Sequence, residues 1–375
     1  MNLLFKTKLQ NILLTTFTAT LLTACGSDSS ILSDNTYTTA NTGETIELGI
    51  DNPVCQEGSA TQEGTITDAE TNEGVSGVTV EIAGCKVITD SDGFYKFSNI
   101  PASNRTSVNF TKDGYMQHSE IIQIKENSLN FIETTLDDNV DHWTYQSEKG
   151  YEDERLDIGE DVIYLETNNS TYTGEINLYY SYRNTTTAEG RDSFPGEYKG
   201  KDEDENIVSF VSYGLMVLEL KDKENNPLSI SKPITITVKD LTDIQDDTIP
   251  LWYYNEDQGI WIEKGYAQKI EDGKYSCEIT HTGIWSISKP IETEMGLYKG
   301  KILDADENPM SNVRIRATGK NWITQDLTTD ENGEFEVYVV PNEKFRLSAY
   351  DYKEKFGAAF PEELDAISAG VIIEE

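Results

Sequence analysis

The fold is decided by two stretches, Thr89-Asp90-Ser91-Asp92-Gly93-Phe94-Tyr95-Lys96-Phe97 and Thr329-Asp330-Glu331-Asn332-Gly333-Glu334-Phe335-Glu336-Val337. In each stretch an aspartate can accept hydrogen bonds from the amides that follow it, and a glycine can supply a positive φ. The residues after the glycine alternate apolar with polar, as in a half-buried strand. Each stretch therefore predicts a tight turn that leads into a β-strand.

The two stretches belong to an internal repeat. Between Thr89 and Pro101, and between Thr329 and Pro341, the copies keep a constant offset of 240 residues without a gap. Upstream of the turn, Gly64-Thr-Ile66-Thr-Asp68 corresponds to Gly300-Lys-Ile302-Leu-Asp304. Because their turns lie at one offset, we expect both copies to form sandwiches of the same topology.

Alternating strands and turn clusters recur along the rest of the chain. Val78–Ile82, Ile234–Val238 and Val313–Ala317 alternate apolar with polar residues. Short strands at regular spacing, separated by turn signals, are typical of sandwiches and barrels. The predicted fold is all-β, with three tandem β-sandwich domains after a signal peptide and a flexible tether.

The repeat resembles the carboxypeptidase-regulatory-like domain, a transthyretin-like β-sandwich. The resemblance covers residues 61–137 and 293–375. It implies spacer or accessory modules of secreted and surface proteins, without catalytic residues of their own. The fold is grouped with carbohydrate-binding-like folds, which suggests sugar binding without demonstrating it.

The block between the repeats, residues 138–292, is rich in tryptophan. It predicts a β-hairpin with Asn255–Gly259 as its loop, and alternation places Trp252, Trp261 and Trp285 in a sandwich core. The block resembles a module of bacterial surface lipoproteins that also occurs in cartilage intermediate layer protein, for which no activity is carried over. The matching residues are Pro250, Leu251, Trp252, Gly259, Trp261, His281 and Trp285.

The N-terminus is predicted to be a lipoprotein signal. Residues 1–24 carry two lysines, a short apolar run and small residues before Cys25, which is typical of a signal peptide. Leu22-Thr-Ala24-Cys25 resembles the lipobox, which implies cleavage between Ala24 and Cys25 and acyl chains such as palmitate on the Cys25 thiol. Gly26, rather than aspartate, then favours the bacterial outer membrane, with the protein facing the periplasm or the surface. Residues 25–60 are expected to form the acylated Cys and a flexible tether.

The strongly negative net charge of the chain excludes nucleic acid as a partner. The 375 residues contain 30 Lys+Arg and 67 Asp+Glu, which gives a formal net charge of −37. A chain this acidic does not bind nucleic acid, because phosphate contacts need clustered Lys and Arg. The expected membrane contact is through the acyl chains on Cys25.

Catalytic and metal-binding patterns are weak. The three histidines, His118, His142 and His281, form no zinc-hydrolase spacing, and we expect His281 to be a hydrogen-bonded histidine beside Trp285. Asp90 and Asp92 are the best candidates for calcium ligands, although their turn lacks the glutamate that an EF-type loop requires. No catalytic residue, metal site or cofactor is predicted.

Two tryptophans and the cysteines complete the candidate sites. Trp143 at a domain junction and Trp322 in a loop could stack on a sugar, or pack on a neighbouring domain. Cys55 and Cys85 lie near each other in sequence and are a disulfide candidate. Cys277 shares the core face of its strand and is expected to remain a buried thiol.

These features predict a lipid-anchored cell-envelope protein with a structural, adhesive or domain-display role. Its partner would be a polysaccharide or another envelope protein. One alternative is a carbohydrate-binding lipoprotein, which a platform of aromatic side chains would favour. A second is a glycan hydrolase or its accessory, which a pocket with a carboxylate pair would favour.

Overall fold

The all-β prediction is confirmed in the part of the chain that the structure describes. Its one helix there is the single turn α1 (Ala188–Asp192). No helix in this part is long and apolar enough to span a membrane. The computed structural model describes residues 36–43, 45–47, 58–82, 84–138, 140–160, 162–241, 244–256, 258–324, 327–351, 356–359 and 363–374.

The first repeat forms a sandwich of a three-stranded and a four-stranded sheet, with strand orders β6-β3-β9 and β5-β4-β7-β8. Alternate residues of β3 are buried along its whole length, as the sequence pattern predicted. The strands are β3 (Ala60–Asp68), β4 (Thr79–Ile82), β5 (Cys85–Ile88), β6 (Phe94–Ile100), β7 (Ser103–Thr111), β8 (His118–Ile124) and β9 (Leu129–Leu136).

The second repeat has the same topology, which confirms the expectation drawn from the repeat. Its sheets have the orders β27-β24-β30 and β26-β25-β28-β29, so each strand has its counterpart in the first sandwich. In both copies the central strand pairs antiparallel on one side and parallel on the other. The strands are β24 (Gly296–Lys301), β25 (Arg314–Thr318), β26 (Leu327–Thr328), β27 (Glu334–Val339), β28 (Arg346–Asp351), β29 (Phe356–Ala359) and β30 (Ile372–Glu374).

The middle block is built on one eleven-stranded sheet, rather than on two separate sheets as in the repeats. The order is β10-β15-β17-β23-β20-β21-β22-β19-β12-β11, and β16 pairs with both β17 and β21. The strands are β10 (Asp141–Gln146), β11 (Tyr151–Glu152), β12 (Leu156–Ile158), β15 (Glu175–Arg183), β16 (Lys199–Lys201), β17 (Ile207–Asp222), β19 (Ile234–Val238), β20 (Thr248–Asn255), β21 (Ile260–Glu271), β22 (Lys274–Ile279) and β23 (Gly283–Pro290). A small sheet adds β13 (Tyr164–Leu165), β14 (Thr171–Tyr172) and β18 (Ser229–Ile230).

Two long strands let this sheet curl around its core. β17 has a register shift between Ser212 and Gly214, and β21 has one opposite the step from Leu251 to Trp252. Such bulges bend a strand and increase its twist. Because β16 bridges the two long strands, β17, β23, β20, β21 and β16 form a closed circuit of strand pairs. Trp252 and Trp261 belong to one apolar cluster, and Trp285 belongs to another. Trp252, Trp261 and Trp285 are fully buried, as predicted.

Part of the segment predicted as a flexible tether is instead built into the fold. β1 (Thr36–Thr38) pairs with β2 (Thr45–Glu47), and Thr39 and Asn41 between them are buried. The Asn41 side chain donates to the carbonyl of Ile291 and accepts from the amide of Ser209. A polar segment can be part of a fold when its buried polar groups have hydrogen-bond partners. The polar composition of residues 36–43 and 45–47 therefore did not indicate that they form part of the structure.

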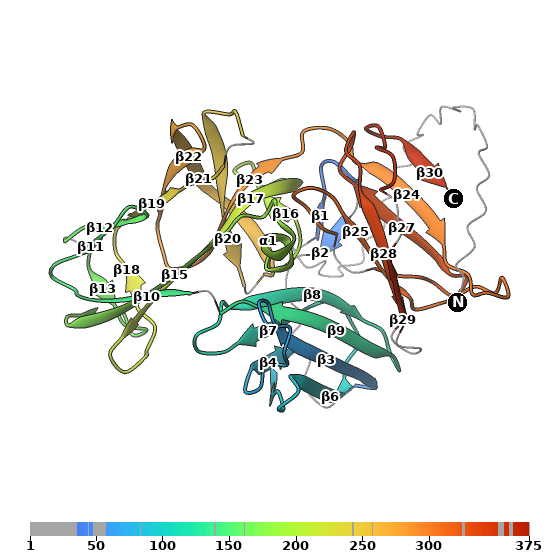
Figure 1. Ribbon diagram of the computed structural model, residues 1–375, viewed down its shortest axis with the longest axis horizontal. Coiled ribbons are helices and arrows are strands. Elements are labelled where there is room, and N and C mark those ends of the chain that lie inside the picture. Colours follow the sequence, from blue (N-terminus) through green and yellow to red (C-terminus); the bar gives the residue numbers. More distant parts are fainter. Residues whose placement is uncertain are drawn as a thin grey trace, which may run out of the picture.

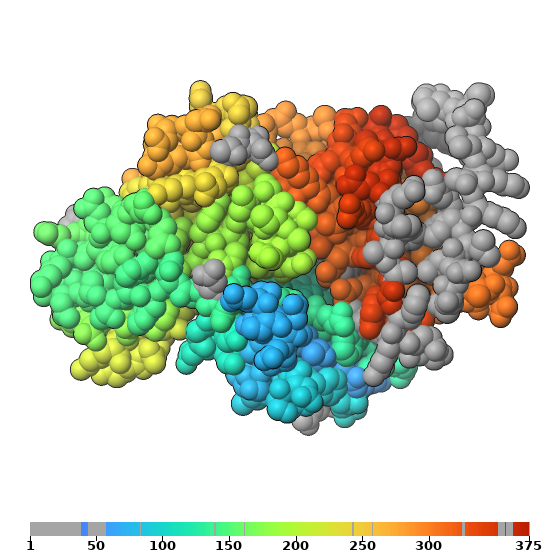
Figure 2. All heavy atoms as spheres, in the orientation of Figure 1, coloured from blue at the N-terminus to red at the C-terminus, as the bar shows by residue number. Residues whose placement is uncertain are grey.

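The three units lie against one another (Figure 1). The first sandwich, blue to cyan, lies along the middle module, green to yellow, and next to the orange and red third unit (Figure 2). One apolar cluster runs from Phe210 and Trp252 of the middle block to Ile315 and Phe345 of the third. The middle and third units therefore share a core.

Candidate functional site

Most of the predicted lipidation and disulfide residues lie outside the described residues. This applies to Ala24, Cys25 and Cys55. Cys85, the first residue of β5, is disulfide-bonded, and its pairing with Cys55 stays a prediction. Cys277 is a free, buried thiol, as expected, and burial raises its pKa to about 12.

Of the two calcium candidates, Asp90 uses its carboxylate within its own turn, and Asp92 contributes its backbone amide there. Asp90 Oδ1 accepts hydrogen bonds from the amides of Asp92 and Phe94, at 3.0 and 2.9 Å. Asp330 does the same in the second repeat, where bonding to the Glu334 amide lowers its pKa. Among the described residues, no three His, Cys, Asp or Glu side chains are grouped as metal ligands.

The two candidate stacking tryptophans are both engaged by protein. Trp322 is only 3% exposed, and its indole Nε1 donates to Glu343 Oε1 at 3.1 Å. Trp322 lies in the loop between β25 and β26, as predicted, and its burial among apolar residues agrees with packing rather than sugar stacking. Trp143 on β10 is half-buried and has the Arg155 guanidinium 4.9 Å from its ring centroid.

His281 is a structural histidine beside Trp285, as predicted. Their ring centroids are 4.7 Å apart, and Trp285 Nε1 donates to the His281 carbonyl at 3.1 Å. Burial lowers the pKa of the imidazole. The ring therefore packs as a neutral group within an aromatic cluster.

Polar contacts tie the first sandwich to the middle module. Arg105 Nη2 donates to Glu197 Oε2 at 3.1 Å and to the Gly259 carbonyl at 2.6 Å, and Nη1 donates to the Gln258 carbonyl at 2.8 Å. Burial alone would raise the pKa of Glu197, but Lys199 and Arg105 hold it below its ordinary value. The Ser119 carbonyl also accepts from the Gly196 amide at 2.8 Å.

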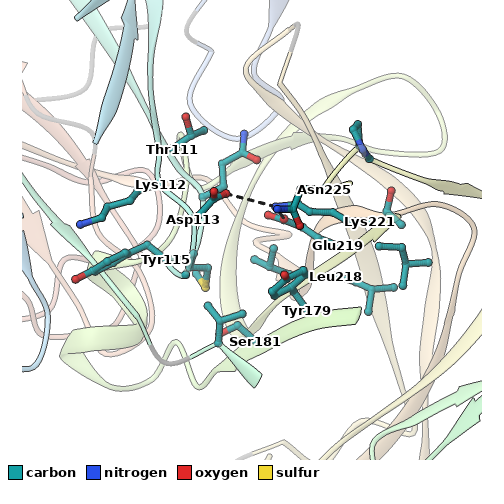
Figure 3. A pocket seen from close by; sticks show the side chains of 18 of the residues that line it. Thr111, Lys112, Asp113, Tyr115, Tyr179, Ser181, Leu218, Glu219, Lys221 and Asn225 are labelled. Atoms are coloured by element: carbon teal, nitrogen blue, oxygen red, sulfur yellow. Dashed lines mark ion pairs between the residues drawn. The ribbon is translucent and has the colours of Figure 1, made fainter. Parts of the chain in front are cut away.

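A cleft of about 660 Å³ lies at this junction. We call it the junction cleft. One wall is the turn between β7 and β8 with Lys112 and Tyr115; the other is the outer face of β15 and β17 with Tyr179, Lys221 and Asn225 (Figure 3). Its volume is within the range of about 300–1,000 Å³ that is usual for ligand sites.

Charged side chains connect the two walls of the junction cleft. Lys221 Nζ lies 2.9 Å from Glu219 Oε2 and 4.0 Å from Asp113 Oδ1 on the opposite wall. Lys112 Nζ donates to the Ser76 carbonyl and lies 4.8 Å from the Tyr115 ring centroid. The charges of the cleft are thus largely satisfied within the protein.

Tyr179 occupies the centre of the sheet wall. Its ring stacks on His142 of β10, with centroids 4.5 Å apart and planes at 10°, and Lys221 Nζ lies 5.1 Å from its centroid. The neighbouring Leu178 and Tyr180 point into the core. Alternation in residues 175–183 could have placed Tyr179 on an outer face, but the opposite wall comes from a strand pair some seventy residues upstream.

Comparison with solved structures finds β-rich chains at low similarity. A type II cohesin–X-dockerin complex from Acetivibrio cellulolyticus matches 21% of this chain at 22% identity with a TM-score of 0.17. The TIE protein of Bacillus anthracis matches 84% at 12% identity and 0.20, and the major pilin SpaD of Corynebacterium diphtheriae matches 86% at 9% and 0.21. This chain covers 57%, 49% and 98% of them, respectively. None of these three TM-scores reaches 0.5, so no function is carried over.

A search of curated proteins finds no match. Residues 62–136, which span the first sandwich from β3 to β9, match the family of carboxypeptidase regulatory-like domains. The matched range agrees with the resemblance drawn from the first repeat. For the second repeat, residues 293–375, that resemblance stays a prediction, supported by the shared strand order. The first sandwich is thus similar to carboxypeptidase regulatory-like domains.

Proposed function

We propose that the chain is a non-catalytic cell-envelope protein with a structural or adhesive role, anchored in the outer membrane by acyl chains on Cys25. The observation that carries this proposal is the docking of three β units into one body. Displaying a binding surface away from a membrane requires such fixed geometry, because a loosely jointed chain loses orientation.

Both apolar and polar contacts support the docking. The apolar cluster shared by the middle and third units contains fully buried Trp252 and Ile315. The Ser212 amide donates to the Asn321 carbonyl across the same junction at 3.0 Å. Arg105 and Glu197, whose side chains are each 11% exposed, join the first sandwich to the middle module.

The surroundings of the histidines favour a non-catalytic role. A histidine that activates a side-chain nucleophile lies within hydrogen-bond reach of that nucleophile. In the described part of the chain, His118 lies 3.7 Å from Glu120, His142 contacts Asn177, and His281 contacts the Thr282 carbonyl. None of these partners is a serine, threonine or cysteine side chain that the histidine could activate.

Replacing Cys25 tests the anchor. Cells expressing the Cys25→Ser protein should show no palmitate label on this chain, and the protein should leave the membrane fraction. The Cys277→Ala protein is the matched control, because Cys277 is buried in the middle module, and it should keep both label and fractionation. A labelled, membrane-bound Cys25→Ser protein would contradict the proposal.

A further inference from the structure

The junction cleft is electrically neutral although the whole chain carries a net charge of −37. Its charged lining consists of two lysines, Lys112 and Lys221, and two carboxylates, Asp113 and Glu219, so the formal charge is zero. Lys221 lies between both carboxylates. With a formal charge of zero, the lining attracts neither anions nor cations by net charge, and the Lys112 ammonium is held by the Ser76 carbonyl and the Tyr115 ring. The cleft therefore suits a neutral ligand.

The same cleft presents hydrogen-bonding groups that the protein does not use. Among the described residues, the Tyr179 hydroxyl and the side-chain amides of Gln117 and Asn225 have no protein partner. The hydroxyls of Thr79 and Thr111 also line it. Hydroxyl and amide groups both donate and accept, as do the hydroxyls of a sugar. Most aliphatic lining residues, such as Leu218, are buried, and Val140 is half-buried.

In the described part of the chain, the strands that contribute residues to the cleft lining are paired on both sides, and the edge strands β8 and β10 only adjoin it. β4 pairs with β5 and β7, and β7 also pairs with β8. β15 pairs with β10 and β17, and β17 pairs with β23 on its other side. Extended peptides are commonly bound by strand addition to a free edge. This arrangement therefore favours a ligand held through side chains.

We propose that the junction cleft binds a neutral oligosaccharide between the first sandwich and the middle module. The inference rests on the proposed non-catalytic role and names the ligand class of that role. Tyr179, Gln117 and Asn225 hydrogen-bond sugar hydroxyls, and Tyr115 lines the wall opposite Tyr179 (Figure 3). Both units contribute, so the site exists only while they are docked.

Two mild substitutions test the cleft. Tyr179→Phe removes one hydroxyl and keeps the ring on His142. Asn225→Gly removes the amide and tolerates the φ of +67°. The full chain, purified in detergent, is first screened on an array of neutral and anionic oligosaccharides. The strongest neutral binder is then titrated by calorimetry.

We expect each variant to weaken binding roughly 3- to 10-fold, the usual effect of one lost hydrogen bond. Tyr266→Phe and Asn168→Gly, on exposed positions outside the cleft, should leave the affinity unchanged. The inference is overturned if no neutral oligosaccharide binds, if anionic sugars bind more tightly, or if folded cleft variants bind as well as the unaltered chain. The palmitate label on Cys25 is independent of these outcomes, so failure of the sugar site would leave the anchored role standing.

Discussion

Arg105 joins the first sandwich to the middle module through its guanidinium group. Its guanidinium makes three hydrogen bonds across the junction, to Glu197, Gln258 and Gly259. Arg105→Ala leaves a buried carboxylate and two carbonyls without these donors. We expect it to cost about 1.5–3 kcal/mol, the usual range for hydrogen bonds to charged groups, measured as a lower midpoint of thermal unfolding.

Arg346→Ala is the control for this substitution. The Arg346 side chain is 68% exposed and lies 3.8 Å from Glu363. Exposed ion pairs of this kind contribute about 0–1 kcal/mol. Equal losses in the two variants would mean that the Arg105 contacts do not hold the junction.

Glu197 gives the same junction a pH dependence. Its pKa in the folded protein lies below the ordinary value of 4.5, because Lys199 and Arg105 outweigh the effect of burial. A lowered pKa stabilises the fold at pH values above the unfolded pKa, and this contribution is lost as the pH falls through the folded pKa. The stability advantage of the unaltered chain over Glu197→Gln should therefore shrink below pH 4.5. Unfolding midpoints of both proteins against pH measure this, and a constant difference would contradict it.

Gly93 shows why the turn of the repeat needs glycine. Its φ is +74°, and an added Cβ would lie 2.1 Å from the Ile66 carbonyl oxygen. Gly77→Ala is the matched control, because Gly77 has φ of +75° but nothing within 4 Å of its Cβ position. We expect Gly77→Ala to cost about 1–2 kcal/mol from the backbone alone and Gly93→Ala clearly more, in the same unfolding measurement. Similar losses of stability in the two variants would show that the backbone around Ile66 shifts easily to make room for the added Cβ.

At the scale of elements, local patterns predicted the strands well. Alternation in Ile234–Val238 is reproduced as burial of Ile234, Ile236 and Val238 in β19. The predicted hairpin loop is confirmed, because β20 ends at Asn255 and β21 begins at Ile260. These features depend on neighbours a few residues apart, which is the range over which side-chain period and turn chemistry act.

The junction cleft could not be predicted in this way. Tyr179 and Tyr115 face it from units whose packing is set by tertiary contacts, and neither carries a distinctive local motif. Trp143 and Trp322 are the tryptophans that the sequence offers for sugar stacking, yet Trp322 is buried and the half-buried Trp143 has Arg155 over its ring. The docking of the units decides which aromatic side chains remain accessible. The alternation of apolar and polar residues in a single sequence does not reveal that docking.

The segment around Asn41 is an element that its composition concealed. Its backbone carbonyl accepts from the Met295 amide at 2.9 Å, and its side chain bonds Ile291 and Ser209. Asn41→Ala should cost about 1–2 kcal/mol, because two buried backbone groups lose their partners. Thermal unfolding of this variant, beside Asn168→Ala in an exposed turn, measures the difference. Identical midpoints would show that the Asn41 side chain contributes no stability.

At the scale of the whole molecule, the shared core limits how far the chain can be divided. The middle and third units are separate in sequence pattern, but Trp322 and Phe345 belong to the same apolar cluster as Phe210. Sharing of a core couples the unfolding of its parts, because exposing one side removes burial from the other. The boundary near residue 293 therefore separates two sets of strands, but it does not separate two units that unfold independently.

The net charge of the whole chain makes its stability depend on salt concentration. With 67 acidic and 30 basic residues, most carboxylates have no cationic partner, and their repulsion opposes the compact state. Raising the ionic strength from about 0.01 M to about 0.15 M shortens the Debye length from about 30 Å to about 8 Å. The added salt therefore screens this repulsion. Salt also weakens attractive pairs, but exposed pairs such as Lys344–Asp365 contribute little, and the buried Arg105–Glu197 pair is screened least. The unfolding midpoint at neutral pH should therefore rise with NaCl and equally with KCl. A flat or falling midpoint would show that attractive pairs, rather than self-repulsion, dominate the electrostatics of this fold.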